Sequence, residues 1–131
     1  TEDMQTAFQR MKALMAALAL TSMMGSGAAW ADGNDLMQTC QSLLQFDDNG
    51  KANNPMKIGQ CIGYMNGAIG IASELNKYLP QEDQICLPNG TSTPIQLARV
   101  VVNFMRRSPQ IMSYDDGAIT LAAFQAAYPC K

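Results

Sequence analysis

The sequence predicts an all-α fold, a small disulfide-bonded four-helix bundle that spans residues 32–131. Apolar residues recur at three- and four-residue steps in four separate segments, as they do in helices that bury one face. Proline and glycine lie between these segments and mark their ends. An even number of cysteines in a small domain indicates disulfides in an oxidising compartment. All the cysteines follow residue 31: Cys40, Cys61, Cys86 and Cys130.

We expect residues 1–31 to be a leader, made of a short non-native stretch and a secretory signal peptide. Lys12 supplies the basic start, residues 13–24 the apolar segment, and Ala29-Trp30-Ala31 the small-x-small cleavage signal. The apolar segment is shorter than the ~18–20 residues that span a bilayer. We therefore predict cleavage after Ala31, export to the periplasm, and no membrane association of the mature domain at residues 32–131.

The first helix is predicted to begin between Asp32 and Asp35, where acidic side chains favour the positive end of the helix dipole, and to end at the turn sequence 47–50. Asn54-Pro55 combines an N-cap with a proline at the first helical position, so a second helix starts here and runs to about Tyr78. The predicted apolar faces are Leu36, Met37, Cys40, Leu43 and Leu44 in the first helix and Ile58, Cys61, Ile62, Met65, Ile69 and Ala72 in the second.

Four glycines form a row on one side of the predicted second helix: Gly59, Gly63, Gly67 and Gly70. Each glycine inside a helix costs about 0.5–1 kcal/mol relative to alanine, so the row costs about 2–4 kcal/mol in all. Close approach of another backbone along the row would offset this cost, and we expect such a tightly docked neighbour. The alternative interpretation is a frayed or kinked helix.

A third helix is predicted to begin at Thr93-Pro94, which repeats the cap-and-proline pattern, and to end with Arg106 and Arg107 before Ser108-Pro109. A fourth helix, rich in alanine, follows over residues 115–127. The connector at residues 80–93 is long for a helical bundle, which indicates either a function or a disulfide anchor.

The disulfide pairs follow from an up-down-up-down arrangement of these helices. Cys40 and Cys61 are then level on adjacent antiparallel helices, whereas Cys86 and Cys130 both lie at the opposite end. We predict the pairs Cys40–Cys61 and Cys86–Cys130, each worth on the order of 3–4 kcal/mol through loop-closure entropy. A zinc site is the rival interpretation, but the chain has no CxxC pair and no histidine, so we expect no metal.

The composition disfavours both catalysis and nucleic-acid binding. Without histidine, the chain lacks the usual general base and catalytic dyad partner. Cysteines in disulfides cannot act as nucleophiles, and the adjacent acid pairs at 47–48, 82–83 and 115–116 lie at predicted helix ends, where solvated caps are the expected role. Nine acidic and seven basic residues follow residue 31, a balance that predicts no nucleic-acid binding. We expect no enzyme activity and no cofactor.

Four motifs in order resemble one protein family. They are Cys61-Ile-Gly-Tyr64 with Gly67, Ile85-Cys-Leu-Pro88 with Gly90-Thr91, Gln96-Leu97 followed by Val101-Val102, and the Ser108-Pro109 step with the terminal Ala127-Tyr-Pro-Cys130. Together they resemble the Rap/Tai immunity proteins of type VI secretion systems, over roughly Met37 to Cys130. The chain departs from the family pattern at Ser108, where a histidine is common, and at Gln110, where an acid is common.

The resemblance implies a small exported α-helical protein, often a homodimer, that binds and blocks a peptidoglycan amidase injected into the periplasm. It also implicates the third helix and an adjoining loop, from different subunits of a dimer, in binding this partner. The alternative function is a periplasmic helical chaperone of the acid-stress type.

An amidase of the Cys/His peptidase class has its catalytic pair at the bottom of a groove. A helix is too broad to enter such a groove, at about 10–12 Å across, so we expect a loop to do so. The loop between the third and fourth helices is the first candidate, and the connector with Glu82-Asp83 is the second. Tyrosine is frequent at binding hot spots, so Tyr114 is the expected anchor. The predicted partner-binding residues are Arg106, Arg107, Tyr114, Asp115 and Asp116.

Overall fold

The computed structural model describes residues 3–10, 31–88 and 92–131. The chain forms two compact units, Thr1–Trp30 and Ala31–Lys131. In the first unit residues 3–10 are helical, and the predicted apolar segment and cleavage signal up to residue 30 lie outside the described residues. The second unit contains the hydrophobic core and both disulfides, and the rest of the description concerns this unit.

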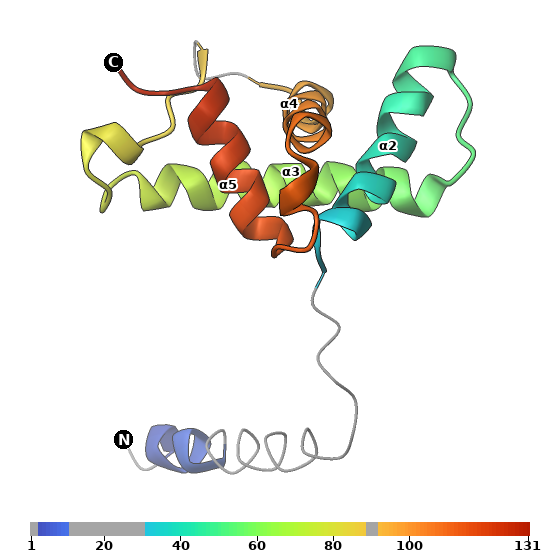
Figure 1. The fold of residues 1–131 in the computed structure, drawn as a ribbon. Coiled ribbons are helices and arrows are strands. Elements are labelled where there is room, and N and C mark those ends of the chain that lie inside the picture. The colour runs from blue at the N-terminus through green and yellow to red at the C-terminus, as the bar shows by residue number, and fades with distance from the viewer. Residues whose placement is uncertain (1–2, 11–30, 89–91) are drawn as a thin grey trace. The chain divides into compact units, whose positions relative to one another are not determined.

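Four α-helices make up most of the described part of the second unit (Figure 1). Within the described residues no strand forms, and extended backbone pairs only in two isolated bridges, Asp32–Asp115 and Ile85–Pro129. The predicted all-α fold is therefore confirmed. The elements are α2 Gly33–Asn49, α3 Pro55–Leu75, η1 Gln81–Asp83, α4 Pro94–Arg107, η3 Pro109–Ile111 and α5 Asp116–Ala127, where η denotes a 3-10 helix.

The first two helices begin at the caps that the sequence predicts. The Asp32 carboxylate accepts hydrogen bonds from the backbone N–H groups of Asn34 and Asp35, at 2.8 and 3.2 Å. Asn54 Oδ1 accepts one from the N–H of Lys57 at 3.1 Å. These bonds satisfy donors that have no partner inside the helix, which is why the chain turns helical at these positions.

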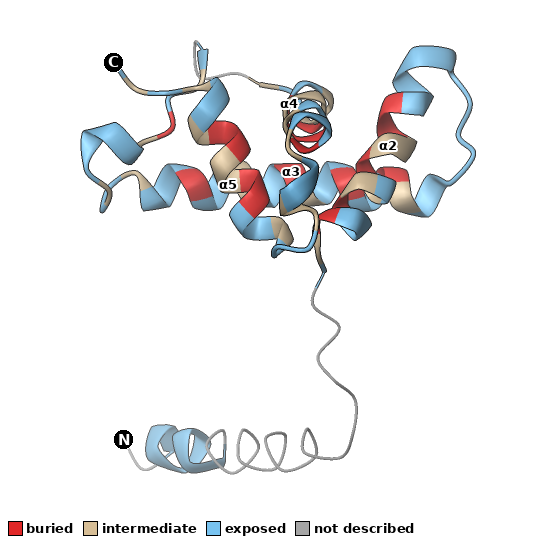
Figure 2. Ribbon diagram, in the orientation of Figure 1, coloured by how far each residue is buried: buried red, intermediate tan, exposed pale blue. Residues whose placement is uncertain are grey.

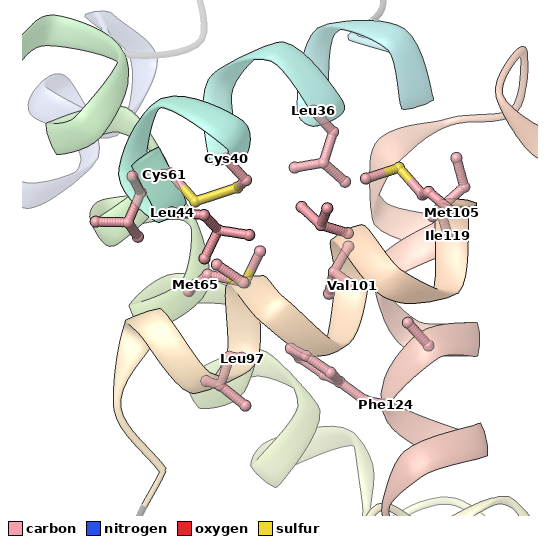
Figure 3. Close-up of a cluster of buried hydrophobic side chains, with 14 of the residues drawn as sticks. Leu36, Cys40, Leu44, Cys61, Met65, Leu97, Val101, Met105, Ile119 and Phe124 are labelled. Carbon is pink, nitrogen blue, oxygen red and sulfur yellow. A yellow bond between two sulfur atoms is a disulfide. The ribbon is translucent and has the colours of Figure 1, made fainter. Parts of the chain in front are cut away.

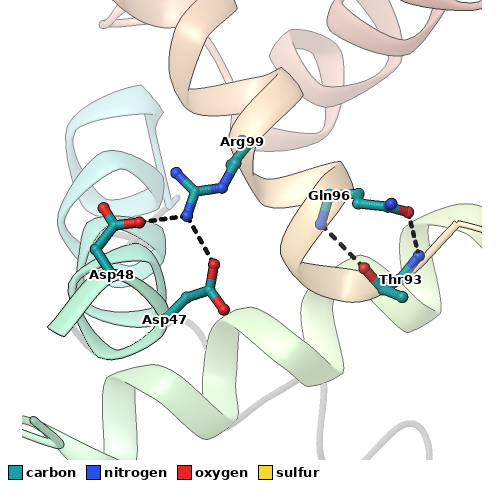
Figure 4. A network of polar contacts seen from close by, with 5 residues as sticks. All are labelled: Asp47, Asp48, Thr93, Gln96 and Arg99. Carbon is teal, nitrogen blue, oxygen red and sulfur yellow. Dashed lines mark hydrogen bonds and ion pairs between the residues drawn. The ribbon is translucent and has the colours of Figure 1, made fainter. Parts of the chain in front are cut away.

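Helix α4 is held by a capping box at its start and by an ion pair in its second turn (Figure 4). Thr93 Oγ1 accepts from the Gln96 N–H at 3.2 Å, and Gln96 Oε1 accepts from the Thr93 N–H at 3.0 Å. Arg99 Nη2 bonds Asp47 Oδ2 at 2.7 Å and also Asp48 Oδ1, and both carboxylates raise the pKa of the guanidinium above its ordinary value. The acid pair at 47–48 therefore ties the last turn of α2 to α4.

The helices do not form the up-down-up-down arrangement that the sequence analysis assumed. α2 and α3 form a hairpin, but α4 is seen nearly end-on in Figure 1 whereas α3 lies across the view, so these two helices cross steeply. The long connector after α3 allows the chain to change direction before α4 begins. α3 is the longest of the four, and the other three all pack against it.

Apolar side chains from all four helices meet in one core (Figures 2 and 3). Phe124 of α5 is its largest fully buried side chain. The predicted apolar face of α3 is confirmed except at Ile62, which is 36 % exposed because it lies toward the open side of the helix. The buried residues are Leu36, Cys40, Leu43, Leu44, Ile58, Cys61, Met65, Ala72, Ile85, Leu97, Ala98, Val101, Val102, Met105, Ile119, Ala123 and Phe124.

Both predicted disulfide pairs are present, Cys40–Cys61 and Cys86–Cys130. The first joins α2 to α3 inside the core, and both of its cysteines are fully buried (Figure 3). The second joins the connector to the C-terminal segment, where Cys86 is exposed and its N–H donates to the carbonyl of Tyr128 at 2.8 Å. One disulfide therefore cross-links two helices inside the core, and the other cross-links the connector to the C-terminal segment.

The glycine row of α3 does not pack against another helix of this chain, so that expectation was wrong. A Cβ atom added at Gly59, Gly63, Gly67 or Gly70 would meet nothing within 4 Å. The reason is geometric, because at 100° per residue the row lies on the side of α3 opposite to Cys61 and Met65, which face the core. The row is open in the single chain, and α3 is a continuous helix through it.

The difference in burial predicts the order in which the disulfides are reduced. With limiting dithiothreitol under native conditions, Cys86–Cys130 should open first, since a thiolate must reach a sulfur atom to attack it. Alkylation followed by peptide mapping gives the order, and repeating it in denaturant, where both disulfides are accessible, is the control. Labelling of Cys40 and Cys61 before Cys86 under native conditions would contradict this assignment.

Candidate functional site

The predicted partner-binding residues lie along the loop between α4 and α5. Arg106 and Arg107 are exposed in the last turn of α4, and η3 leads from them to Tyr114, which is 61 % exposed. Asp115 is exposed, and Asp116, the first residue of α5, is partly buried. Within the described residues, no ion pair involves either arginine or either aspartate. The loop thus presents an aromatic ring and free charges of both signs.

The N-terminal segment of the second unit holds this loop in place. The N–H of Gly33 donates to the Tyr114 carbonyl at 3.1 Å, and the N–H of Asp116 donates to the Ala31 carbonyl at 3.2 Å. Between them, Asp32 and Asp115 form an antiparallel bridge. Tyr114 is therefore exposed, but the backbone is held at its carbonyl and at the N–H of Asp116. The sequence did not predict this arrangement.

Gly33 is the residue that permits this close contact. It is buried, and a Cβ atom added there would lie 2.7 Å from Ile119 Cδ1, 2.8 Å from the Met112 carbonyl oxygen and 2.9 Å from Met112 Cα. Two of these neighbours are backbone atoms of the α4–α5 loop and cannot move aside without moving the loop. The Asn34 side chain adds a hydrogen bond to the same Met112 carbonyl at 3.3 Å.

Two glycines of the open row, Gly63 and Gly67, line a groove between α3 and α5. The groove has a volume of about 350 Å³ and leads into a second hollow of about 440 Å³ along α3, which shares Gly67 and Ile71 with it. Asp116 lies at the α5 side of the groove, so the predicted partner-binding loop and the predicted packing glycines meet here. The groove is lined by Gly63, Tyr64, Gly67, Ala68, Ile71, Asp116, Gly117, Thr120 and Leu121, and the second hollow by Asn66, Gly67, Gly70, Ile71, Glu74, Leu75 and Tyr78.

A pair of hydroxyl groups connects α3 to the start of α5 beside the groove. Thr120 Oγ1 donates to the Asp116 carbonyl at 2.8 Å and lies 2.9 Å from the Tyr64 hydroxyl. Because Thr120 has one hydroxyl hydrogen and gives it to Asp116, Tyr64 must be the donor to Thr120. Burial raises the pKa of Tyr64 above its ordinary value, and the negative charge of Asp116 raises it further.

The second candidate loop, the connector, is tethered through its described part. Asn76 both donates to the Ile85 carbonyl at 2.7 Å and accepts from the Ile85 N–H at 2.9 Å. Gln84 bonds the carbonyls of Asn76 and Leu79, and Cys86 is fixed by its disulfide. Glu82 and Asp83 are exposed on η1. These contacts favour a structural role for residues 76–88, as an anchor for the end of α3.

The described residues contain no cluster of cysteine and carboxylate side chains that could hold a metal ion. They also contain no helix that is both long enough and apolar enough to cross a bilayer.

Comparison with protein families gives a match to the Rap1a immunity proteins over residues 32–130. The chain belongs to the Rap1a immunity protein family. The match begins at the residue that caps α2 and ends at the cysteine that closes the C-terminal disulfide, so it covers the whole helical unit. Comparisons with curated proteins and with solved structures returned no significant match.

Membership of the Rap1a family confirms the resemblance drawn from the motifs. The family consists of immunity proteins of type VI secretion, which are generally not enzymes, are typically periplasmic, and bind a secreted effector. In this Rap1a protein the residues missed by sequence analysis are Ala31, Gly33, Tyr64 and Thr120. Tyr64 belongs to one of the family-like motifs and Ala31 to the predicted cleavage signal, but neither pattern indicated a role in holding the loop.

Gly33→Ala should destabilise the protein, because its methyl group must displace the Met112 backbone. We expect a loss of about 1–3 kcal/mol in the free energy of unfolding. Gly117→Ala, in α5, is the matched control, since its methyl group enters open space and should be neutral or stabilising by up to about 1 kcal/mol. Chemical denaturation measures both, and equal stability of the two variants would refute the close contact.

The raised pKa of Tyr64 predicts how stability changes in alkali. A folded-state pKa above the ordinary value of 10.0 gives stability that is present below pH 10 and is lost as the pH rises through the folded value. Tyr64→Phe has no phenolic proton to lose, so the free energy of unfolding of the wild type should fall relative to that of this variant as the pH rises above 10. Tyr114→Phe, at an exposed ring, is the control, and a difference that stays constant would contradict the assignment.

Proposed function

We propose that this Rap1a protein is a periplasmic immunity protein that binds and inhibits a peptidoglycan amidase, of the Cys/His peptidase class, delivered by a type VI secretion system. In this proposal a signal peptide directs export and is cleaved after Ala31. The observation that carries the proposal is an exposed tyrosine, Tyr114, on a loop whose backbone is fixed by the N-terminal segment. A binding loop that is already rigid loses little conformational entropy when it meets its partner.

The geometry supports insertion of this loop into the active-site groove of the amidase. Tyr114 can supply apolar contact and a hydrogen bond at the tip, as tyrosines do at interface hot spots. Asp115 and Asp116 are free of ion pairs with described residues, so they can approach a catalytic imidazolium of the amidase. Arg106 and Arg107 supply positive charge beside the loop and favour an acidic rim on the partner.

The protein's own residues support an inhibitory rather than a catalytic role. The chain has no histidine, and both disulfides occupy all four cysteines. The acid pair at 47–48 binds Arg99, and no described carboxylate is buried. The alternative of an acid-stress chaperone gains no specific support. Such a chaperone would open its fold when buried carboxylates are protonated at low pH, and no described carboxylate is buried.

The open glycine row supports a homodimer as the form that binds the effector. If two copies of α3 pack antiparallel about a two-fold axis, Gly63 of one copy faces Gly67 of the other, and Gly59 lies within one residue of Gly70. No charged residue occurs on α3 between Ile58 and Ser73, so no charge has to be desolvated there. The second backbone would then provide the contact that offsets the cost of the glycines.

Calorimetric titration of the cognate amidase tests the binding loop. Tyr114→Ala should weaken binding by about 2 kcal/mol or more, as expected of a hot-spot residue, and the Asp115→Ala/Asp116→Ala double variant should weaken it as well. Glu82→Ala/Asp83→Ala, on the tethered connector, is the matched control and should bind as wild type. If both loop variants bind within about 0.5 kcal/mol of wild type while folded, and the control loses affinity, the connector is the inserting loop.

Light scattering after size-exclusion chromatography tests the dimer. Gly63→Glu should fold, since open space surrounds the position within one chain, but it should run as a monomer because each copy would bury a carboxylate against the α3 backbone of the other. Ala126→Glu, at an exposed position of α5, is the control and should remain a dimer. A dimeric Gly63→Glu variant would exclude α3 as the interface.

A further inference from the structure

The carbonyl of Ala31 holds the first residue of α5. It accepts the hydrogen bond from the Asp116 N–H at 3.2 Å, next to the Asp32–Asp115 bridge. Ala31 is also the last residue of the proposed leader, so cleavage after Ala31 would remove this acceptor from the protein. This inference therefore depends on the cleavage site named in the proposed function.

No other described group takes the place of the Ala31 carbonyl. Asp115 occupies the N-cap position of α5, but its side chain makes no capping hydrogen bond. The Asp116 carboxylate is engaged with the N–H of the following residue, Gly117, at 2.6 Å. Once Ala31 is gone, the Asp116 N–H has no acceptor within the described chain, and it lies at the positive end of the α5 dipole.

Cleavage also changes the charge beside the loop. Hydrolysis of the Ala31–Asp32 peptide bond consumes one water, leaves a carboxylate on Ala31 in the departing leader, and creates an α-ammonium group on Asp32. The Gly33 N–H keeps its bond to Tyr114, so the loop remains attached on that side. The mature chain thus has a free Asp116 N–H and an additional positive charge on Asp32. In the precursor, the Asp116 N–H is bonded to the Ala31 carbonyl.

We propose that removal of the leader completes the effector-binding surface, because it frees the Asp116 N–H to bond an acceptor oxygen of the effector, such as a backbone carbonyl. In the precursor the Ala31 carbonyl occupies the position of that oxygen. The mature protein alone then offers this donor, next to Tyr114 on the same loop. Immunity is in this way coupled to export and processing.

Three chains that differ only at the N-terminus test the first part of this proposal without any effector. They are Asp32–Lys131, the same chain with Ala31 retained, and Asp32–Lys131 with an acetylated α-amino group, whose acetyl carbonyl replaces that of Ala31. We expect the Asp116 amide to exchange hydrogen at least about tenfold faster in the first chain than in the other two, as measured by NMR. The Cys86 amide, bonded to Tyr128 at the far end, should exchange alike in all three.

Equal exchange of the Asp116 amide in the three chains would overturn the proposal, whether or not the protein binds an amidase. If exchange differs as expected, titration with the cognate amidase tests the second part. The unmodified Asp32 chain should bind about three- to tenfold more tightly than the acetylated chain, the effect of one hydrogen bond. Equal affinity would show that the freed donor is not used, whereas a failure of all three chains to bind would instead reject the proposed function.

Discussion

The backbone contact between residues 31–34 and the α4–α5 loop is the constraint on which the rest of the site depends. It joins the start of α2 to the start of α5, and it requires Gly33, because a Cβ atom there would collide with Met112 and Ile119. The loop can therefore leave Tyr114 exposed without becoming loose, since the Tyr114 carbonyl and the Asp116 N–H are paired with the N-terminal segment. Rigidity comes from hydrogen bonds behind the loop, and the side chains in front remain available.

The α4–α5 loop and the groove between α3 and α5 meet at Asp116. On one side lies the charged loop, and on the other lies the groove walled by the glycines of α3. Tyr64 of α3 bonds Thr120, which bonds the Asp116 carbonyl, so α3 and the N-terminal segment both hold the first turn of α5. A second copy bound along α3 would lie close to the loop. In the proposed dimer, residues of both subunits could then contact the effector.

Local signals made most of the fold predictable, and long-range backbone contacts made the rest unpredictable. Asn54-Pro55 and Thr93-Pro94 mark helix starts because capping and proline act within one turn. The disulfide pairs were correct although the assumed up-down-up-down order of the helices was wrong, because Cys40–Cys61 needs only α2 and α3 to be neighbours. The glycine spacing defined a row but not what faces it, and the pairing of Asp32 with Asp115 involves main-chain groups that leave no pattern in the sequence. The sequence places the predicted partner-binding residues on one loop, and their role in binding stays a prediction, but the attachment of this loop to the N-terminal segment was not predicted.

The central claim is that the effector binds the loop at Tyr114 and that the α3 face serves the dimer. Hydroxyl-radical footprinting of the mature protein, with and without the cognate amidase, tests it with two exposed tyrosines in one sample. Tyr114 is 61 % exposed on the loop, and Tyr78 is 84 % exposed at the end of the glycine-lined hollow. The account predicts that the amidase suppresses oxidation of Tyr114 and leaves that of Tyr78 unchanged. Protection of Tyr78 with no change at Tyr114 would contradict it.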